Sequence, residues 1–149
     1  MGSQLRTTRL GQSDLEVSVL GLGTHLFGAY VDESTAVDVV RRALDLGINF
    51  LDTSPLYGHS QAESIIGKSI AGNRHGTIVG TKVGLSADTR PDGSFGTKVD
   101  PLTPGSIRSI VERSLKRLNT DYIDLLQLHA FDDTTPLDDT LGEVASLIE

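Results

Sequence analysis

The stretch Ile48-Asn49-Phe50-Leu51-Asp52-Thr53 decides the fold of this chain. It is a short apolar run of the length of one β-strand, and polar residues follow it. Gly47 stands immediately before it, where a preceding helix commonly ends, and Ser60-Gln61-Ala62-Glu63 beyond it has the pattern of a helix capping box. A strand set between two helices is the repeating unit of a parallel α/β sheet.

The same unit recurs on both sides of this strand. Residues 19–24, 77–83 and 122–129 predict three further buried strands, and a segment of helical period follows each of them. Residues 7–17 predict a small hairpin that turns near residues 11–14. The sequence therefore predicts a hairpin and four βα units, which we expect to form one domain over residues 1–149.

Four helices are predicted by their start signals and apolar stripes. The first begins at Asp32 or Ser34, the second at the Ser60 capping box and the third at Thr103-Pro104, and the fourth is expected to run to the last residue. The side chains expected to face inward are Val37, Val40, Ala43 and Leu44 in the first helix, Ile65, Ile66 and Ile70 in the second, Ile107, Ile110, Val111, Leu115 and Leu118 in the third, and Leu137, Leu141, Val144 and Ile148 in the fourth.

Strands that are apolar on both faces indicate a parallel sheet covered by helices, either a doubly wound sheet or a (β/α)8 barrel. A doubly wound sheet would carry a dinucleotide-binding fingerprint after its first strand. Gly21-Leu22-Gly23 supplies two of the glycines, but Leu26 stands at the third position and the next helix does not begin at once. We therefore interpret the paired glycines as a place of close backbone packing.

The composition excludes several classes of function. The 149 residues contain no Cys, which excludes disulfides, thiolate catalysis and Cys-ligated metal sites. Thirteen Lys and Arg stand against twenty Asp and Glu, for a net charge of -7, and such an acidic surface argues against binding to nucleic acid or to an anionic membrane. Because there is no apolar run of membrane-spanning length and no signal-peptide core, we expect a cytoplasmic protein.

The candidate chemistry lies at the ends of three strands, because reactive groups of parallel βα proteins gather where the strands end. This rule selects Asp52 and the nearby Tyr57, Lys82 near the end of the third strand, and His129 at the end of the fourth. Each has a structural explanation when taken alone, but four such residues at one end of the sheet favour a functional site. The other histidines have no ligand spacing, so no metal is expected.

These four residues suit proton transfer to a substrate oxygen. Tyr57 carries a proton at neutral pH, and a neighbouring Lys82 ammonium would stabilise the tyrosinate form and so improve Tyr57 as a general acid. Asp52 would hold that ammonium, and His129 could donate a hydrogen bond to the same oxygen. Because the set contains no nucleophile–base pair, carbonyl reduction or enolisation fits better than hydrolysis.

Four segments of the sequence resemble the aldo-keto reductase family. They are Leu20-Gly21-Leu22-Gly23-Thr24, Asn49-Phe50-Leu51-Asp52-Thr53-Ser54-Pro55-Leu56-Tyr57-Gly58, Gly80-Thr81-Lys82 and Asp121-Tyr122-Ile123-Asp124-Leu125-Leu126-Gln127-Leu128-His129. They follow the order and spacing of the family over nearly the whole chain, and Glu63 and Gly67 in the next helix extend the match. The resemblance implies a TIM barrel, represented here by its hairpin and first four βα units, that binds NADP(H) without a Rossmann domain and reduces aldehydes or ketones to alcohols.

The resemblance also implies roles for individual residues. By position, Tyr57 is similar to the general acid/base of the family, Lys82 and Asp52 to the pair that tunes it, and His129 to the group that orients the carbonyl. The variants Ser-Pro-Leu-Tyr-Gly and Gly-His-Ser look closer to the microbial sugar, quinone and aryl-alcohol branches, which implies a sugar or an aromatic carbonyl as substrate.

The implied cofactor site is only partly represented. Gly23, Thr24 and Asp52 are similar to residues that line the nicotinamide end of the cofactor. The segments that hold the adenosine phosphates, the ribose and the stacking face of the nicotinamide belong to later strands of the family's barrel, to which this sequence has no counterpart.

The family's barrel has eight βα units and this sequence has four, which leaves three interpretations open. The chain is the N-terminal half of a longer reductase, as the lack of a capping residue at Glu149 favours. It is a half-barrel that a second copy or a partner chain completes, as the open edges of a four-stranded sheet favour. Or it is a non-catalytic interaction module, against which the four filled site positions argue.

Residues 85–102 form a long connection rich in Gly, Ser, Pro and Asp. It leaves the mouth at which the candidate residues gather, and connections of this length are commonly functional or mobile. We expect Phe95 or its neighbours to shape the substrate pocket, and a disordered insertion is the alternative.

Overall fold

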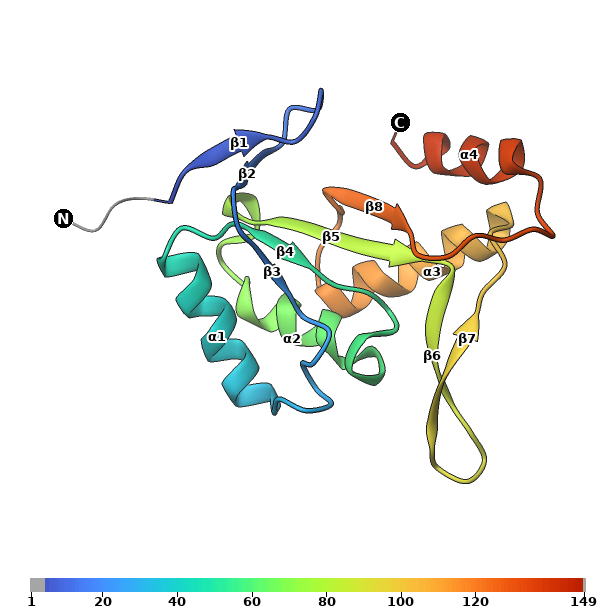
Figure 1. The fold of residues 1–149 in the computed structure, drawn as a ribbon, viewed down its shortest axis with the longest axis horizontal. Helices are drawn as coiled ribbons and strands as arrows, with labels where there is room; N and C mark the ends of the chain where they lie inside the picture. Colours follow the sequence, from blue (N-terminus) through green and yellow to red (C-terminus); the bar gives the residue numbers. More distant parts are fainter. Residues whose placement is uncertain (1–4, 149) are drawn as a thin grey trace.

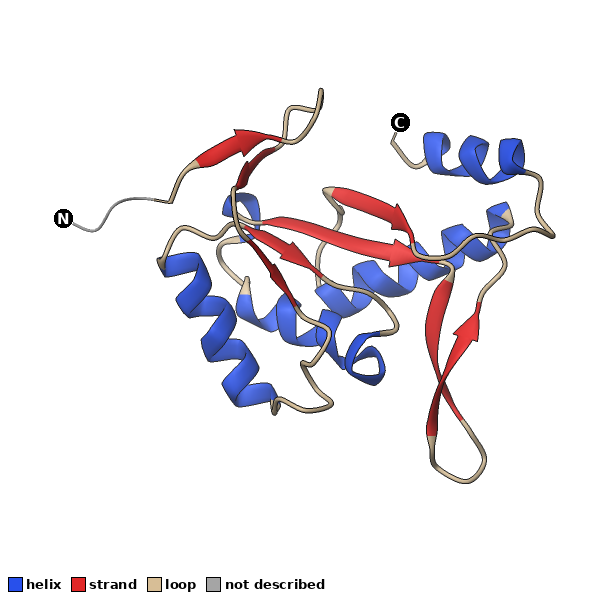
Figure 2. Ribbon diagram, in the orientation of Figure 1, coloured by secondary structure: helices blue, strands red, loops and turns tan. Residues whose placement is uncertain are grey.

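The structure, a computed structural model, describes residues 5–148. At its centre is a parallel sheet of order β3-β4-β5-β8 (Figures 1 and 2). Its strands are β3 (Gly21–Gly23), β4 (Phe50–Asp52), β5 (Ile78–Val83) and β8 (Leu125–Leu128). The register sets Gly23 beside Asp52, Asp52 beside Gly80, and Lys82 beside Gln127. The carboxyl ends of the strands therefore meet at one edge of the sheet, as predicted.

Three helices cover one face of the sheet (Figure 1), and they are α1 (Glu33–Asp45), α2 (Gln61–Ser69) and α3 (Pro104–Leu118). The period-2 alternation turns Leu51, Val79 and Val83 toward them, and all three are fully buried. Leu51 and Val79 pack with α1 and α2, and Val83 packs with α3. The inward-facing side chains predicted for these helices are all buried or half-buried, so their apolar stripes are confirmed.

The opposite face of the sheet is open. Phe50, Leu125 and Gln127 surround Gly80 on this face, and the three side chains are only half-buried. Parallel strands with helices on one side are the architecture of the first half of a (β/α)8 barrel. Within residues 5–148 the sheet does not close on itself, and β3 and β8 are its edges. The α/β class is thus confirmed, and the barrel is present in part.

The N-terminal hairpin is confirmed. Strands β1 (Thr7–Arg9) and β2 (Glu16–Ser18) pair antiparallel. Asn49 ties the hairpin to the beginning of β4, because its side-chain amide donates to Glu16 O (2.9 Å) and its Oδ1 accepts from Ser18 N (2.7 Å). The hairpin therefore lies at the end of the sheet opposite the strand ends that carry the candidate residues.

The first strand is shorter and less buried than predicted. Residues 19–24 were expected as a buried strand, but β3 covers only Gly21–Gly23, and Val19 and Leu20 are exposed. The reason is that no strand in the described part of the chain pairs with the outer edge of β3.

The predicted capping box is wrong. Ser60 precedes α2 with φ 71°, and its hydroxyl donates to Pro55 O (2.8 Å) instead of capping the helix. Residues 58–60 are all left-handed, whereas an N-cap serine needs extended backbone. Glu63, which the motif would turn back to the helix start, is fully buried and contacts β5 and α3.

The fourth helix is also shorter than predicted. Helix α4 (Leu137–Ser146) ends before the last residue, a turn covers residues 147–148, and Glu149 lies outside the described residues. Val144 packs against α3, but Leu137, Leu141 and Ile148 are exposed. The apolar stripe exists, but residues 5–148 provide a neighbour for only part of it.

Residues 85–102 contain an ordered hairpin, so the disordered insertion is wrong. Strands β6 (Leu85–Thr89) and β7 (Phe95–Val99) pair antiparallel, and this hairpin projects from the end of β5 (Figure 1).

A short 3-10 helix, Arg74–Gly76, precedes β5. Among residues 5–148, no helix is long and apolar enough to span a membrane.

Candidate active site

Asp52 and Lys82 form an ion pair at the carboxyl ends of β4 and β5. Lys82 Nζ lies 2.7 Å from Asp52 Oδ1 and donates to Thr53 O at 2.9 Å. The Lys82 side chain is 10% exposed and that of Asp52 is 32% exposed, so the ammonium is the more deeply buried partner. Burial of an ammonium costs free energy unless the group is paired, and here the Asp52 carboxylate and the Thr53 carbonyl both accept hydrogen bonds from it.

Tyr57 lies directly beside this pair. It begins the turn at residues 57–60 that links β4 to α2, and Lys82 Nζ lies 4.8 Å from the centre of its ring. Two imidazoles flank the phenol in T-shaped contacts, with ring centres 5.8 Å away for His129 and 4.9 Å for His25. The structure therefore brings all four predicted residues, Asp52, Tyr57, Lys82 and His129, into one cluster.

His129 is held by strand β5 through its backbone and by Ser54 through its side chain. Its backbone N–H donates to Val83 O at 2.8 Å, and its Nδ1 lies 3.2 Å from the hydroxyl of the fully buried Ser54. Burial lowers the pKa of His129 below its ordinary value, and the nearby Lys82 ammonium acts in the same direction, while Asp52 opposes them. The imidazole is therefore biased toward its neutral form.

The two remaining residues of the implied cofactor site lie at the end of β3. Gly23 is exposed, and no atom would lie within 4 Å of a Cβ placed on it, so the space above it is open. Thr24 is fully buried, and its backbone N–H and its hydroxyl both donate to Asp52 O at 3.0 Å. Gly23 thus provides an open surface beside Asp52, and Thr24 fixes the backbone of Asp52. Direct contact between Thr24 and a cofactor stays a prediction.

Sequence reasoning missed three residues of the cluster. Gln127 Nε2 donates to Asp52 Oδ1 at 3.0 Å, Ser54 contacts His129, and His25 contacts Tyr57. The strand period could have found Gln127, because residues 127 and 129 face the same side of β8. Nothing local predicts the contacts of Ser54 and His25, which depend on how separate loops meet.

A second buried ion pair lies on the helix-covered face of β5. Glu63 of α2 accepts from Thr81 Oγ1 and from Arg117 Nε of α3, each at 2.6 Å. Gly67, one turn further along α2, allows close approach of α3, since a Cβ there would lie 2.5 Å from Leu118 O. Glu63 and Gly67 therefore join two helices to the strand that carries Lys82.

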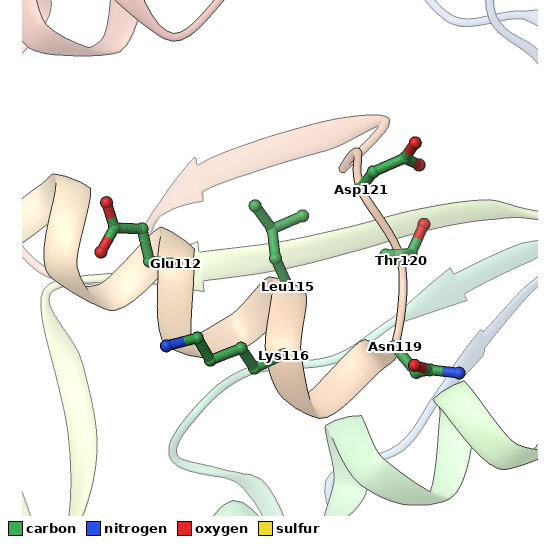
Figure 3. A pocket seen from close by; sticks show the side chains of 6 residues that line it. All are labelled: Glu112, Leu115, Lys116, Asn119, Thr120 and Asp121. Carbon is green, nitrogen blue, oxygen red and sulfur yellow. The ribbon is translucent and has the colours of Figure 1, made fainter.

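A wide surface hollow of about 760 Å³ lies at the other end of the sheet (Figure 3). Leu115 and Lys116 near the end of α3 and Asp121 in the loop before β8 belong to its lining. Because this loop enters β8 at its amino end, the hollow lies away from the Tyr57 cluster, and we assign it no chemistry.

No three His, Asp or Glu side chains of residues 5–148 are grouped as metal ligands.

The comparisons with known proteins agree with one family. The model of the aldo/keto reductase family matches residues 19–149. The oxidoreductase YqkF of Bacillus subtilis is 41% identical over 137 residues, which cover 92% of this chain and 43% of the relative. Aldo-keto reductase YhdN of the same organism is 39% identical, over 95% of this chain and 43% of the relative. The chain thus spans less than half the length of these curated relatives.

Solved structures show the same similarity. The holo form of aldo-keto reductase AKR11C1 from Bacillus halodurans superposes with a TM-score of 0.84 at 38% identity, over 96% of this chain and 46% of that one. The glycerol dehydrogenase AKR11B4 from Gluconobacter oxydans gives a TM-score of 0.83 at 35% identity, over 99% of this chain and 46% of that one.

Proposed function

Because the chain belongs to the aldo/keto reductase family, we propose that it carries the proton-transfer half of an NADP(H)-dependent carbonyl reductase. The substrate is an aldehyde or a ketone, and the product is the alcohol. The observation that carries the proposal is the buried Lys82–Asp52 pair beside Tyr57. A structural ion pair alone needs no phenol next to its ammonium, whereas a phenol that donates a proton benefits from a neighbouring positive charge, because that charge stabilises the tyrosinate.

Tyr57 is the proposed proton donor. As the carbonyl oxygen gains negative charge, the phenol O–H bond breaks and its proton passes to that oxygen, which leaves a tyrosinate. The Lys82 ammonium stabilises this tyrosinate, and Asp52 and Thr53 O keep the ammonium in place. Bulk water then returns a proton to Tyr57.

His129 is the proposed hydrogen-bond donor to the same oxygen. Ser54 Oγ accepts from Leu56 N at 3.1 Å, and the fully buried serine needs an acceptor for its own hydrogen. Nδ1 of His129 at 3.2 Å is such an acceptor, so the imidazole proton stands on Nε2. The lowered pKa of His129 keeps this neutral donor form at pH 7.

The open surface at Gly23 fits the nicotinamide end of a dinucleotide, with the Asp52 carboxylate beside it. When bound there, NADPH supplies a hydride to the carbonyl carbon. Gly23 would leave room for the ring, and Asp52 would border it. Four of the strands in residues 5–148 form the parallel sheet of the barrel, and its edges β3 and β8 are where further strands would pair. A cytoplasmic location is part of the same proposal.

The test is reduction of a carbonyl compound by the native protein, purified with any chain that copurifies. NADPH oxidation is followed with an aldehyde and with a ketone, for the parent, for Lys82→Met and for the control Lys116→Met, whose side chain is exposed on α3. Lys82→Met is expected to lower kcat/KM by about 10²-fold or more, because the tyrosinate loses its counter-charge. Equal rates in the two variants, or no oxidation of NADPH by the parent, would contradict the proposal.

One observation favours a second function. The sheet has an open face and two unpaired edges within residues 5–148, which is the form of an interaction module that a partner covers. Sedimentation of the native protein together with an NADPH titration distinguishes the two functions, because a module of this kind forms a complex but leaves the fluorescence of NADPH unchanged.

A further inference from the structure

The side chain of Gln127 crosses the open face of the sheet from β8 to β4. The register sets Gln127 beside Lys82 of β5, and the two-residue period turns both side chains to the same face. Gly80 leaves β5 without a side chain on that face, and Gln127 Nε2 lies 3.4 Å from the place of a Cβ on Gly80. Gln127 therefore extends over Gly80 and reaches Asp52 on the far side of β5.

One oxygen of Asp52 takes two donors. Asp52 Oδ1 accepts from Lys82 Nζ at 2.7 Å and from Gln127 Nε2 at 3.0 Å. A carboxylate oxygen can accept two hydrogen bonds, so the two donors do not exclude each other. The charged donor makes the shorter bond, and the amide adds no charge to the pair. Lys82 therefore keeps its counter-charge, while Asp52 gains a second point of attachment.

The second attachment fixes the direction of the Asp52 carboxylate. The last torsion of an aspartate side chain is broad, so a single hydrogen bond leaves the carboxylate plane free to turn. Because Asp52 is half-buried, water also competes for its oxygens. Lys82 and Gln127 approach Oδ1 from different strands, and together they restrict the rotation of the carboxylate.

The direction of the Asp52 carboxylate decides where the Lys82 ammonium lies. The ammonium donates one hydrogen to Asp52 and another to Thr53 O at 2.9 Å. With these two acceptors in place, Nζ lies 4.8 Å from the centre of the Tyr57 ring. If the carboxylate turned, the ammonium would lose one acceptor and could move away from the phenol, and its stabilisation of a tyrosinate would fall with distance. Gln127 therefore acts on Tyr57 through Asp52 and Lys82.

The position of Gln127 suits a neutral donor better than a charged side chain. A glutamate there would set a second carboxylate beside Asp52 and attract the Lys82 ammonium toward β8. A lysine or an arginine would compete with Lys82 for Oδ1. The amide of Gln127 restricts Asp52 without either effect, which is more specific than filling space on the open face.

We propose that Gln127 is a positioning residue for the proton transfer: its amide fixes the Asp52 carboxylate, and the carboxylate fixes the Lys82 ammonium beside Tyr57. This inference rests on the proposed function for the reaction that the ammonium assists. The attachment of the ammonium is measurable without cofactor and without turnover, so the inference and the proposed function are separable by experiment.

The first measurement is NMR of the Lys82 ammonium in the ¹⁵N-labelled 149-residue chain. Ammonium hydrogens that are donated to fixed acceptors exchange with water more slowly than free ones. Gln127→Met keeps the length of the side chain but removes the donor. Leu125→Met is the matched control, because Leu125 is also half-buried and packs beside Gly80 on the same face of β8, but has no donor to lose.

The Lys82 ammonium hydrogens are expected to exchange about tenfold faster in Gln127→Met than in the parent, because the loss of one hydrogen bond loosens their acceptor. Leu125→Met is expected to leave the exchange close to that of the parent. Equal exchange in Gln127→Met and the parent, or equal acceleration in the two methionine variants, would overturn the inference.

The second measurement is the kinetics of the native protein with NADPH and a carbonyl compound. Gln127→Met is expected to lower kcat about tenfold and to leave KM for the carbonyl compound unchanged, because only the proton transfer is affected. Gln127→Glu keeps the shape of the side chain but is expected to lower kcat further, because its carboxylate draws the ammonium from Tyr57. A role in packing alone would make the glutamate the milder variant, and that order would overturn the inference.

The two measurements separate the inference from the proposed function. If Gln127→Met accelerates the exchange as described but the parent oxidises no NADPH, the attachment of the ammonium stands and the proposed reductase function fails. If the parent reduces the carbonyl compound and Gln127→Met has the same kcat, the reductase stands and the positioning role of Gln127 fails.

Discussion

Arg117→Met removes the counter-charge of a carboxylate that has no access to water. Glu63 is fully buried, and the Arg117 side chain, at 23% exposure, is the cation that pairs with it, at 2.6 Å. Thr81 remains as a neutral donor to the other carboxylate oxygen. The variant therefore tests whether this pair holds α2 and α3 to β5.

Breaking a buried ion pair from one side costs about 3–5 kcal/mol, because the other charge stays buried. Arg117 is partly exposed, so water can reach its side of the pair, and we expect the lower end, about 3 kcal/mol. For a chain of this size, that loss lowers Tm by about 10 °C.

The assay is urea unfolding of the 149-residue chain followed by circular dichroism. Arg113→Met is the matched control, because Arg113 lies one turn earlier on α3 and its guanidinium donates to Ser109 Oγ in an exposed hydrogen bond. It should cost less than about 0.5 kcal/mol. The double variant Glu63→Gln with Arg117→Met should recover about 1 kcal/mol or more over Arg117→Met alone, since no bare carboxylate is left. Equal losses for Arg117→Met and Arg113→Met would refute the reasoning.

Three further outcomes are expected. Ser54→Ala should move the proton of neutral His129 partly from Nε2 to Nδ1, which the ¹⁵N shifts of the ring report, and unchanged shifts would remove the assigned role of the serine. Since the pKa of His129 is lowered by folding, the unfolded chain binds more protons just below pH 6.5, so stability falls as the pH drops through that window. His129→Asn should remove this part of the slope in urea unfolding at pH 7.5 and 5.5, and an identical slope would count against the lowered pKa. Gly67→Ala should destabilise the chain by about 1–3 kcal/mol through its contact with Leu118 O, while Gly105→Ala, in open space on α3, should stabilise it slightly, and equal effects would argue against close packing at Gly67.

Much of the fold could be predicted from the sequence because the signals involved are local. Local signals specify the secondary structure of the residues around them. Examples are the apolar stripe of α1 through Val40 and Ala43, the left-handed Gly47 that follows this helix, and the two-residue period of β5. The strand-end rule then placed Asp52, Lys82 and His129 together, since parallel strands bring their carboxyl ends to one edge.

The failures are places where a tertiary contact overrides a local motif. Ser60 and Glu63 fit the capping-box pattern, but the left-handed turn before α2 gives Ser60 the wrong backbone, and Glu63 finds a stronger partner in Arg117. The prediction for α4 fails in the same way, because a helical period indicates which side chains share a face and not whether a neighbour covers that face, and Val144 alone of the four residues expected to face inward packs against the core. Ser54 illustrates the same limit, because its contact with His129 joins residues 75 positions apart.

Tyr57→Phe is the direct test of whether the Tyr57 hydroxyl protonates the substrate oxygen. The single-turnover rate of carbonyl reduction by the native protein with NADPH is compared for this variant and for Tyr122→Phe, whose hydroxyl contacts His75 and lies apart from the cluster. We expect a loss of about 10²–10⁴-fold for Tyr57→Phe, with NADPH still bound, and a rate close to the parent's for Tyr122→Phe. A rate for Tyr57→Phe equal to that of the parent would show that Tyr57 is not the proton donor.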